Sequence, residues 1–171
     1  LGARGPLSSR DGLRIESGGK GVTPLEAQVS ALCEALERHS GMFHGDEPRI
    51  RDSYRGLAGA AIHPNDCLLY DERQYRDRHR WNAAQSPFQY ICDPLDETAP
   101  MDWTPVWSLT YGKHRLLPTG LLYYDVPQEP GHHCVSADSN GNAAGTSLED
   151  AIVQGFLELV ERDAVALWWY N

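Results

Sequence analysis

Two segments of the chain, residues 23–40 and 147–164, alternate apolar and polar positions with the period of an amphipathic helix. At about 100° per residue, the apolar side chains of the first segment gather on one side and the polar ones on the other. The apolar set is Leu25, Val29, Leu32 and Leu36, and the polar set is Glu26, Ser30, Glu34, Glu37 and Arg38. Thr23 also suits the N-cap of such a helix, with Glu26 placed to complete a capping box.

The second segment repeats the first without a gap. The identical pairs are Ala27/Ala151, Val29/Val153, Glu34/Glu158, Glu37/Glu161 and Arg38/Arg162. Its polar set is Asp150, Gln154, Glu158, Glu161 and Arg162, and its apolar set is Val153, Phe156, Val160 and Leu167. Because the second helix is apolar over most of its remaining surface, the pattern predicts a central, buried position for it. Both helices are expected to bury their apolar faces on a sheet and to turn their acidic faces toward each other.

A glycine-rich turn precedes each helix. The first turn reads SGGKGV at residues 17–22, and the second reads DSNGNAAG at residues 138–145. Glycine permits close approach of the backbone to a ligand, and the N-terminus of a helix offers free N–H groups to anions. Lys20 adds a positive charge to the first turn. Neither turn is a Walker motif, so the two turns predict anion binding of another kind.

Between the two helices, shorter apolar and aromatic runs predict strands. The predicted strands are residues 58–64, 67–70, 104–111 and 115–126, with a hairpin turn at 111–113 between the last two. Residues 71–81 carry five basic groups and interleaved acids. We predict a solvated helix or loop there, with an RNA or peptide patch as the alternative. Helices and strands in this order indicate an α+β fold with an internal duplication.

Composition and charge exclude several classes of protein. The 171 residues suit a single domain, and the net charge of −9 argues against a nucleic-acid surface. No apolar run is long enough to span a membrane. The four cysteines are scattered, which is typical of a reduced, cytoplasmic protein: Cys33, Cys67, Cys92 and Cys134. The chain lacks an initiator Met and stops inside an apolar run, so we expect it to be an excerpt of a longer protein.

The repeated ExxER pattern supplies four carboxylates and two arginines on facing helices. Glutamate oxygens bind Mg²⁺, Mg²⁺ binds phosphate oxygens, and arginine or lysine neutralises the remaining phosphate charge. A di-iron carboxylate site is the weaker alternative, because it needs ExxH on two helices and here the spacing is ExxE. A second alternative is a duplicated helix whose acids form only Glu–Arg ion pairs. The pattern favours a magnesium–nucleotide site.

Several stretches resemble the YcaO domain family. The two signature blocks are GGKGVTPLEAQVSALCEALERHSG and ADSNGNAAGTSLEDAIVQGFLELVERDAVALWW. The intervening residues 63–75 and 101–124 resemble the azoline-forming branch, found in thiazole/oxazole-modified microcin (bacteriocin) pathways. Arg4, Gly5 and Pro6 suggest that residues 1–10 are a linker entering the domain. By the resemblance, residues 11–171 are roughly the N-terminal half of a YcaO-like domain, with duplicated loop–helix units on a mixed or antiparallel sheet.

The resemblance implies an ATP- and Mg²⁺-dependent cyclodehydratase that converts Cys, Ser or Thr of a ribosomally made precursor peptide into thiazoline or oxazoline. Thioamide or amidine formation, or a catalytically silent peptide-binding scaffold, are the alternatives. The implied partner is a leader-peptide-recognising domain resembling a ubiquitin-activating enzyme, fused or separate, and a homodimer is left open. We expect the excerpt alone to be inactive.

The resemblance also assigns site residues. The metal-binding acids are Glu34, Glu37, Glu158 and Glu161, and the residues lining the nucleotide are Lys20, Ser30, Arg38, Thr146, Asp150 and Arg162. Two positions depart from the family pattern. Thr146 stands where Asn is common, and Asp150 stands where Glu is usual, so their contacts with the nucleotide are expected to change.

Overall fold

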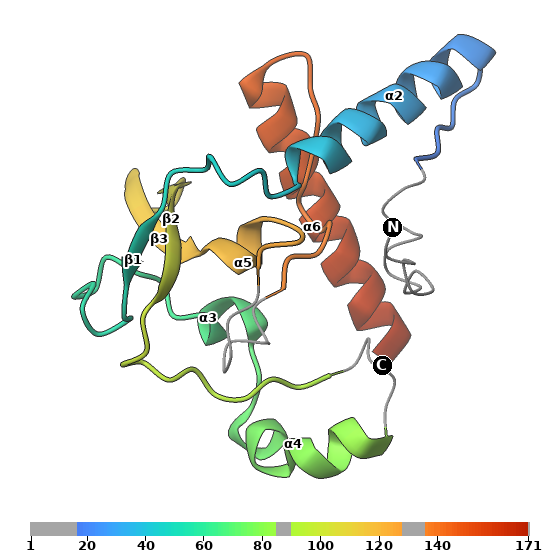
Figure 1. The fold of residues 1–171 in the computed structure, drawn as a ribbon. Coiled ribbons are helices and arrows are strands. Elements are labelled where there is room, and N and C mark those ends of the chain that lie inside the picture. Colours follow the sequence, from blue (N-terminus) through green and yellow to red (C-terminus); the bar gives the residue numbers. More distant parts are fainter. Residues whose placement is uncertain (1–16, 85–89, 128–135, 171) are drawn as a thin grey trace, which may run out of the picture. The chain divides into compact units, whose positions relative to one another are not determined.

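The computed structural model describes residues 17–84, 90–127 and 136–170 and divides the chain into two compact units (Figure 1). Unit 1 comprises Leu1–Met42 and Ser139–Asn171, and unit 2 comprises Phe43–Asp138. The predicted entering linker, residues 1–10, and Cys134 lie outside the described residues. Helices and a sheet are both present, so the α+β prediction is confirmed.

Unit 2 contains an antiparallel sheet of three strands in the order β1-β2-β3. The strands are β1 (Ile50–Asp52), β2 (Met101–Ser108) and β3 (Lys113–Pro118). The β2–β3 pair runs from Trp103 opposite Pro118 to Ser108 opposite Lys113. Gly112 lies in the connecting turn with φ of 58°, a conformation that glycine adopts without a steric penalty. The predicted hairpin is therefore confirmed.

The core of unit 2 lies around Trp103 of β2. Its side chain is fully buried, and its indole Nε1–H donates to the carbonyl oxygen of Asp52 at 2.9 Å. Beside it, the hydroxyls of Thr104 and Thr119 form a buried hydrogen bond at 3.0 Å. The remaining core cluster is Ala61, Met101 and Leu116, flanked by Tyr54, Leu57, Leu95 and Leu121. The indole N–H of Trp103 and the hydroxyls of Thr104 and Thr119 thus each have a hydrogen-bond partner, as burial requires.

Three predicted strand segments differ in the structure. Of residues 67–70, the first two lie in the helix α3 (Asn65–Leu68). The last predicted strand, residues 115–126, is interrupted by the helix α5 (Thr119–Leu122). Residues 58–64 form only an isolated bridge, from Ala61 to Leu116. The side chain of Asn65 explains α3, because its amide donates to the carbonyl of Tyr70 and its carbonyl accepts from the N–H of Tyr70. Such side-chain bonds replace the pairing of a strand.

Residues 71–81 were predicted as a solvated helix or loop, and most of them form the helix α4 (Glu72–Ala84). One face of α4 is fixed to the following segment. Arg78 forms an ion pair with Asp93 at 2.6 Å, and the Asn82 side chain bonds the backbone of Ile91 in both directions. The helix interpretation is confirmed.

Unit 1 contains the two repeated helices, α2 (Pro24–Ser40) and α6 (Leu148–Tyr170). Thr23 caps α2, and Glu26 closes the capping box through the N–H of Thr23 at 2.9 Å. At the start of α6, the hydroxyl of Ser147 accepts from the N–H of Asp150 at 3.2 Å. The predicted cap of the first helix is thus confirmed, since α2 begins one residue after Thr23.

The predicted burial of the apolar helix faces is wrong. On α2, Leu25 is 69% exposed and Leu32 is 66% exposed, and on α6, Phe156 is 62% exposed. Gly155 is the one buried residue among those described in α6. Hydrophobic periodicity shows which face requires a partner but does not supply that partner. The half-buried positions lie instead on the polar faces, where the glycine-rich turns pack.

No helix among the described residues is long and apolar enough to cross a membrane.

Candidate functional site: two loop–helix half-sites

Each repeat builds the same local arrangement, which we call a half-site: a glycine-rich turn, a glutamate and an arginine one turn further along the helix. In the first, the N–H of Gly18 donates to Oε2 of Glu34 at 2.8 Å, and Arg38 binds Oε1 at 2.6 Å. In the second, the N–H of Gly141 donates to Oε2 of Glu158 at 3.0 Å. Arg162 binds the other oxygen of Glu158 at 3.1 Å. The sequence repeat is therefore a structural repeat as well.

Small residues let each turn approach its helix. A Cβ on Gly19 would collide with the backbone of Ala27 and Ala31, so an alanine there would force the turn away from α2. In the second half-site, the glycine that permits the close approach is Gly155 of the helix itself. A Cβ on Gly155 would lie 2.5 Å from the carbonyl oxygen of Gly141 in the turn. The identical alanines of the repeat are half-buried, and each lies against a glycine of its turn: Ala27 against Gly19, and Ala151 against Gly145.

The second glutamate of the first ExxE pattern, Glu37, connects the two half-sites. Burial raises the pKa of Glu37, and the neighbouring carboxylates of Glu158 and Glu34 raise it further. The positive charge of Arg38 and the backbone N–H of Ala144 act in the opposite direction. Glu37 therefore lies close to an acid of α6, which agrees with the prediction that the acidic faces meet.

Glu34 has the opposite electrostatic environment one turn away. Its pKa is lowered, chiefly by the hydrogen bond from Arg38 and then by the N–H of Gly18. Arginine favours the charged carboxylate, whereas nearby negative charge disfavours it. The two glutamates of one ExxE pattern therefore have opposite environments. Arg38 and the Gly18 N–H favour the charged form of Glu34, whereas burial and neighbouring carboxylates disfavour the charged form of Glu37.

A further acid in each half-site holds the start of its helix. Glu26 accepts from the N–H groups of Val22 and Thr23. The equivalent Asp150 accepts from both the N–H and the hydroxyl of Thr146, at 2.9 and 3.2 Å. These bonds lower the pKa of both acids, the largest cause being the backbone N–H of Thr23 for Glu26 and that of Thr146 for Asp150. The two residues that depart from the family pattern are therefore bonded to each other.

The predicted site residues are not all brought together. Glu34, Glu37, Arg38 and Glu158 share one electrostatic environment, and Ser30 is half-buried on the same helix face. Lys20, Glu161 and Arg162 are exposed. Across the described ranges, no three His, Cys, Asp or Glu side chains are close enough together to hold a metal ion. The four-glutamate metal site stays a prediction.

Comparison with known proteins shows the family. The family model described as YcaO cyclodehydratase, ATP- and Mg²⁺-binding, matches residues 18–171. The chain belongs to the YcaO family. An uncharacterized protein of Methanothermobacter thermautotrophicus is 26% identical over 164 residues, which are 94% of this chain and 36% of that protein.

Solved structures agree with the YcaO assignment. A heterocyclase in complex with substrate and cofactor is 51% identical with a TM-score of 0.82, over 88% of this chain and 20% of that one. The heterocyclase TruD is 52% identical with a TM-score of 0.76, over 83% and 21%. A YcaO protein from Methanopyrus kandleri bound with AMPPCP and Mg²⁺ shares the fold at 23% identity and a TM-score of 0.56, over 90% and 32%. The chain thus spans about a fifth of the heterocyclases that it matches.

The YcaO family binds ATP and Mg²⁺, and the two half-sites of this chain supply carboxylate oxygens. Mg²⁺ takes oxygen ligands, and glutamates supply them here. Burial raises the pKa of Glu37, and the two neighbouring carboxylates of Glu158 and Glu34 raise it further. A bound cation relieves such repulsion.

Sequence reasoning missed the backbone donors of the site. The N–H groups of Gly18, Gly141 and Ala144 bind the glutamates, whereas the sequence predicts only anion-binding loops at these turns. The glycine-rich composition was the available signal. It located the turns, but which amide points at which carboxylate depends on how each turn packs on its helix.

Proposed function

We propose that this chain is part of an ATP- and Mg²⁺-dependent cyclodehydratase that forms thiazoline or oxazoline rings from Cys, Ser or Thr of a ribosomally made peptide. The observation that supports the proposal is the pair of matching half-sites, in which the carboxylate of Glu37 is repelled by those of Glu34 and Glu158. Two carboxylates that approach each other without a cation raise the free energy of the empty site, and a metal–phosphate ligand lowers it.

The residues of the two half-sites divide into two groups of donors. The proposed metal ligands are Glu34, Glu37, Glu158 and Glu161, and the proposed nucleotide ligands are Lys20, Ser30, Arg38, Thr146, Asp150 and Arg162. Bound Mg²⁺ would neutralise phosphate charge and orient the terminal phosphate. Arg38 and Arg162 now pair with glutamates through partly exposed contacts, so they can exchange these partners for phosphate oxygens at low cost.

In the proposed reaction, the substrate side chain attacks the carbonyl carbon of the preceding residue and the carbonyl oxygen becomes a hydroxyl. That oxygen takes the terminal phosphoryl group of ATP, and ADP leaves. Loss of phosphate and a proton then closes the C=N bond of the azoline. Phosphorylation converts a poor oxygen leaving group into a good one, so the chain's own groups mainly bind, orient and neutralise charge.

Azoline formation is favoured over thioamide or amidine formation by the likeness to two heterocyclases. The presence of all four glutamates and both arginines of the two ExxER patterns argues against a catalytically silent scaffold. We further propose a cytoplasmic enzyme of a microcin-like pathway that works with a leader-recognising partner domain.

Calorimetric titration of Mg-ATP into the full-length protein tests the proposal. We choose Glu37→Gln because it removes a repelled charge, so loss of binding will not reflect loss of folding. Asp163→Asn is the matched control, because it removes the same charge from an exposed position of α6. We expect Glu37→Gln to weaken binding by about tenfold or more, the loss that even outer-shell changes cause at metal sites, and the control to leave it unchanged. Equal binding by all three proteins would contradict the proposed site.

Turnover gives the second readout. Incubation with ATP and a precursor peptide should release ADP and remove one water from the peptide for each ring, as seen by mass spectrometry. Exchange of oxygen for sulfur in the peptide would indicate the thioamide alternative instead.

A further inference from the structure

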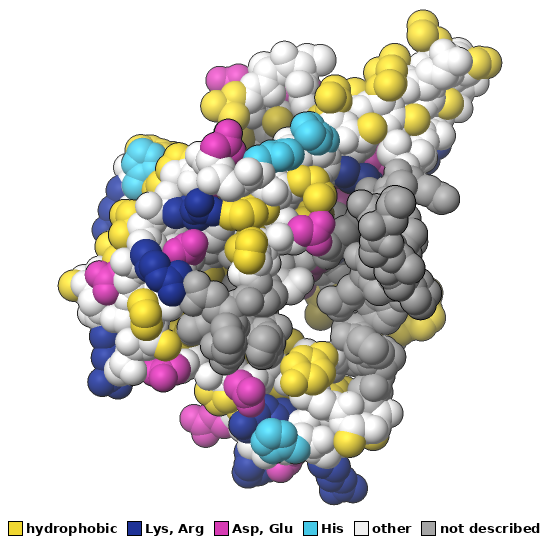
Figure 2. All heavy atoms as spheres, viewed as in Figure 1, with side chains coloured by type: hydrophobic (Ala, Val, Ile, Leu, Met, Phe, Trp, Pro, Cys, Tyr) yellow, Lys and Arg dark blue, Asp and Glu magenta, His cyan; other side chains and the backbone are white. Residues whose placement is uncertain are grey.

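One face of α4 carries exposed arginines that the proposed ATP site does not use. At about 100° per residue, positions 73, 76 and 80 fall within about 60° of one another on a helix. Arg73 is 78% exposed, Arg76 is 68% exposed, and Arg80 is exposed as well. Figure 2 shows Lys and Arg side chains gathered where Figure 1 places α4. This exposed arginine face comprises Arg73, Arg76 and Arg80.

The opposite face of α4 is fixed, so the exposed face is held in place. Arg78 binds Asp93 and Asn82 binds the backbone of Ile91, as described above. At the start of the helix, Asn65 of α3 holds the hydroxyl of Tyr75 at 2.7 Å. The arginine face is therefore presented by an anchored helix.

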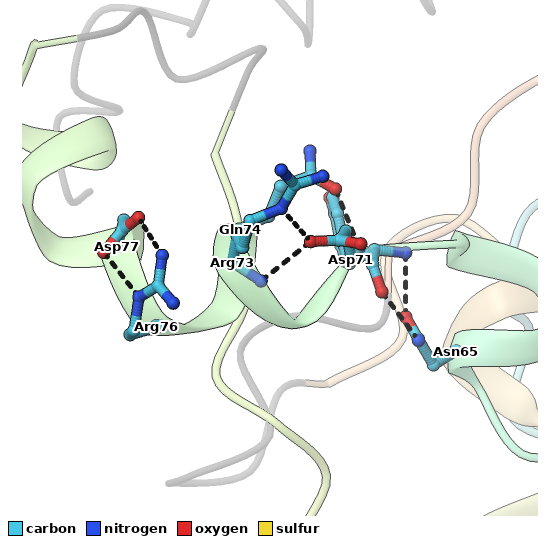
Figure 3. Close-up of polar contacts among 7 residues, drawn as sticks. Asn65, Asp71, Arg73, Gln74, Arg76 and Asp77 are labelled. Atoms are coloured by element: carbon cyan, nitrogen blue, oxygen red, sulfur yellow. Dashed lines mark hydrogen bonds and ion pairs between the residues drawn. The ribbon is translucent and has the colours of Figure 1, made fainter.

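The present partners of these arginines are close in sequence and exposed. Figure 3 shows Arg73 reaching back to Asp71 and Arg76 bound to the adjacent Asp77. Asp71 is 54% exposed and Asp77 is 61% exposed. Exposed ion pairs contribute little to stability, so an incoming carboxylate can replace these aspartates. The described residues give Arg80 no hydrogen bond or ion pair.

The charge of α4 is opposite to that of the chain. Residues 72–84 contain four arginines against two acids, Glu72 and Asp77, whereas the whole chain carries −9. An anionic partner is repelled by most of the chain and attracted here, which fixes where it docks. We propose that the exposed arginine face of α4 docks an acidic stretch of the peptide substrate.

A peptide fits this face better than a nucleic acid does. Three arginines along two turns match a few carboxylates of an extended or helical segment, and arginine binds carboxylates through paired N–H groups. Nucleic-acid binding relies on many phosphate contacts across a basic surface, and the acidic chain does not offer one. The choice of partner rests on the proposed function, but its test does not require turnover.

The test is fluorescence anisotropy of a labelled oligoglutamate peptide titrated with full-length protein, beside an oligoglutamine peptide and an RNA oligonucleotide. The variant is Arg76→Gln with Arg80→Gln. The matched control is Arg51→Gln with Arg55→Gln, which removes the same charge from exposed arginines of the same unit. We expect oligoglutamate to bind with an affinity that falls as salt rises, and to bind the variant about three- to tenfold more weakly.

An equal loss in variant and control would show a general charge effect and overturn the proposal, as would no loss in either. Tighter binding of RNA at the same arginines would identify a nucleic-acid surface instead. Calorimetry with Mg-ATP on the same proteins separates the two proposals. If Mg-ATP binds and oligoglutamate does not, only the docking surface is refuted; if oligoglutamate binds and Mg-ATP does not, only the ATP site is.

Discussion

The two glutamates of the first ExxE pattern should change the stability of α2 in opposite directions. Glu34→Gln removes the negative charge that pairs with Arg38, and it removes one of the two oxygens that accept from Arg38 and from the Gly18 N–H. Glu37→Gln instead removes a charge that Glu34 and Glu158 repel. Both variants lose the same negative charge from one helix. A difference in sign between them can therefore arise only from their local environments.

The magnitudes follow from the contacts. The Glu34–Arg38 pair is about one third exposed, so it is worth about 0.3–0.5 kcal/mol, and the charge-assisted bond from Gly18 brings the loss to about 1 kcal/mol. Each like-charge neighbour of Glu37 costs about 0.2–0.5 kcal/mol, so its removal should stabilise by about 0.5–1 kcal/mol. These changes correspond to about two- to fivefold differences in local opening.

The pH dependence should differ as well. The lowered pKa of Glu34 means that its stabilisation is present above the unfolded value near 4.5 and is lost as pH falls through the folded pKa. The raised pKa of Glu37 gives its contribution to folding stability the opposite pH dependence. The folded state gains stability from Glu37 at low pH and loses it as pH rises through the folded pKa. The advantage of Glu37→Gln over the native chain should thus be full at neutral pH and disappear below about pH 4.5.

Native-state hydrogen exchange of the full-length protein, with a chelator present, measures this directly. Amides of residues 24–40 should exchange faster in Glu34→Gln and slower in Glu37→Gln, with Asp163→Asn as the control for net charge. A shift in the same direction for both glutamates would refute the assignment of opposite environments.

Three further predictions concern the turns, the cap and the core. Gly19→Ala should weaken Mg-ATP binding in calorimetry because its Cβ meets the α2 backbone, whereas Gly18→Ala, with open space around its Cβ, should bind as the native protein does. Thr23→Ala should cost about 1 kcal/mol and speed hydrogen exchange in the first turn of α2, and Thr23→Ser should not. Thr104→Val should cost about 1–3 kcal/mol in denaturant unfolding because it leaves the buried hydroxyl of Thr119 unpaired, and adding Thr119→Val should recover part of that loss.

The sequence by itself determined the features that follow local rules. The cap at Thr23 and the helical period predicted α2, and the repeat of that pattern predicted α6, because caps and periodicity act over a few residues. The repeat of ExxER after a glycine-rich turn predicted the duplicated half-site. The Tyr111–Gly112–Lys113 turn likewise predicted the β2–β3 hairpin, since glycine there relieves a positive φ.

The tertiary structure decided what depends on distant partners. Residues 65–68 became a helix because Asn65 bonds Tyr70, and no propensity scale includes that contact. Only packing could show that Gly18, rather than a neighbouring glycine, donates to Glu34. The pKa of Glu37 depends on Glu158, which is far from it in sequence. Caps, turns and helical periodicity can thus be predicted from the sequence pattern, because they depend on neighbouring residues. The pKa of a carboxyl group and the burial of a side chain depend on distant segments that come together only in the folded chain.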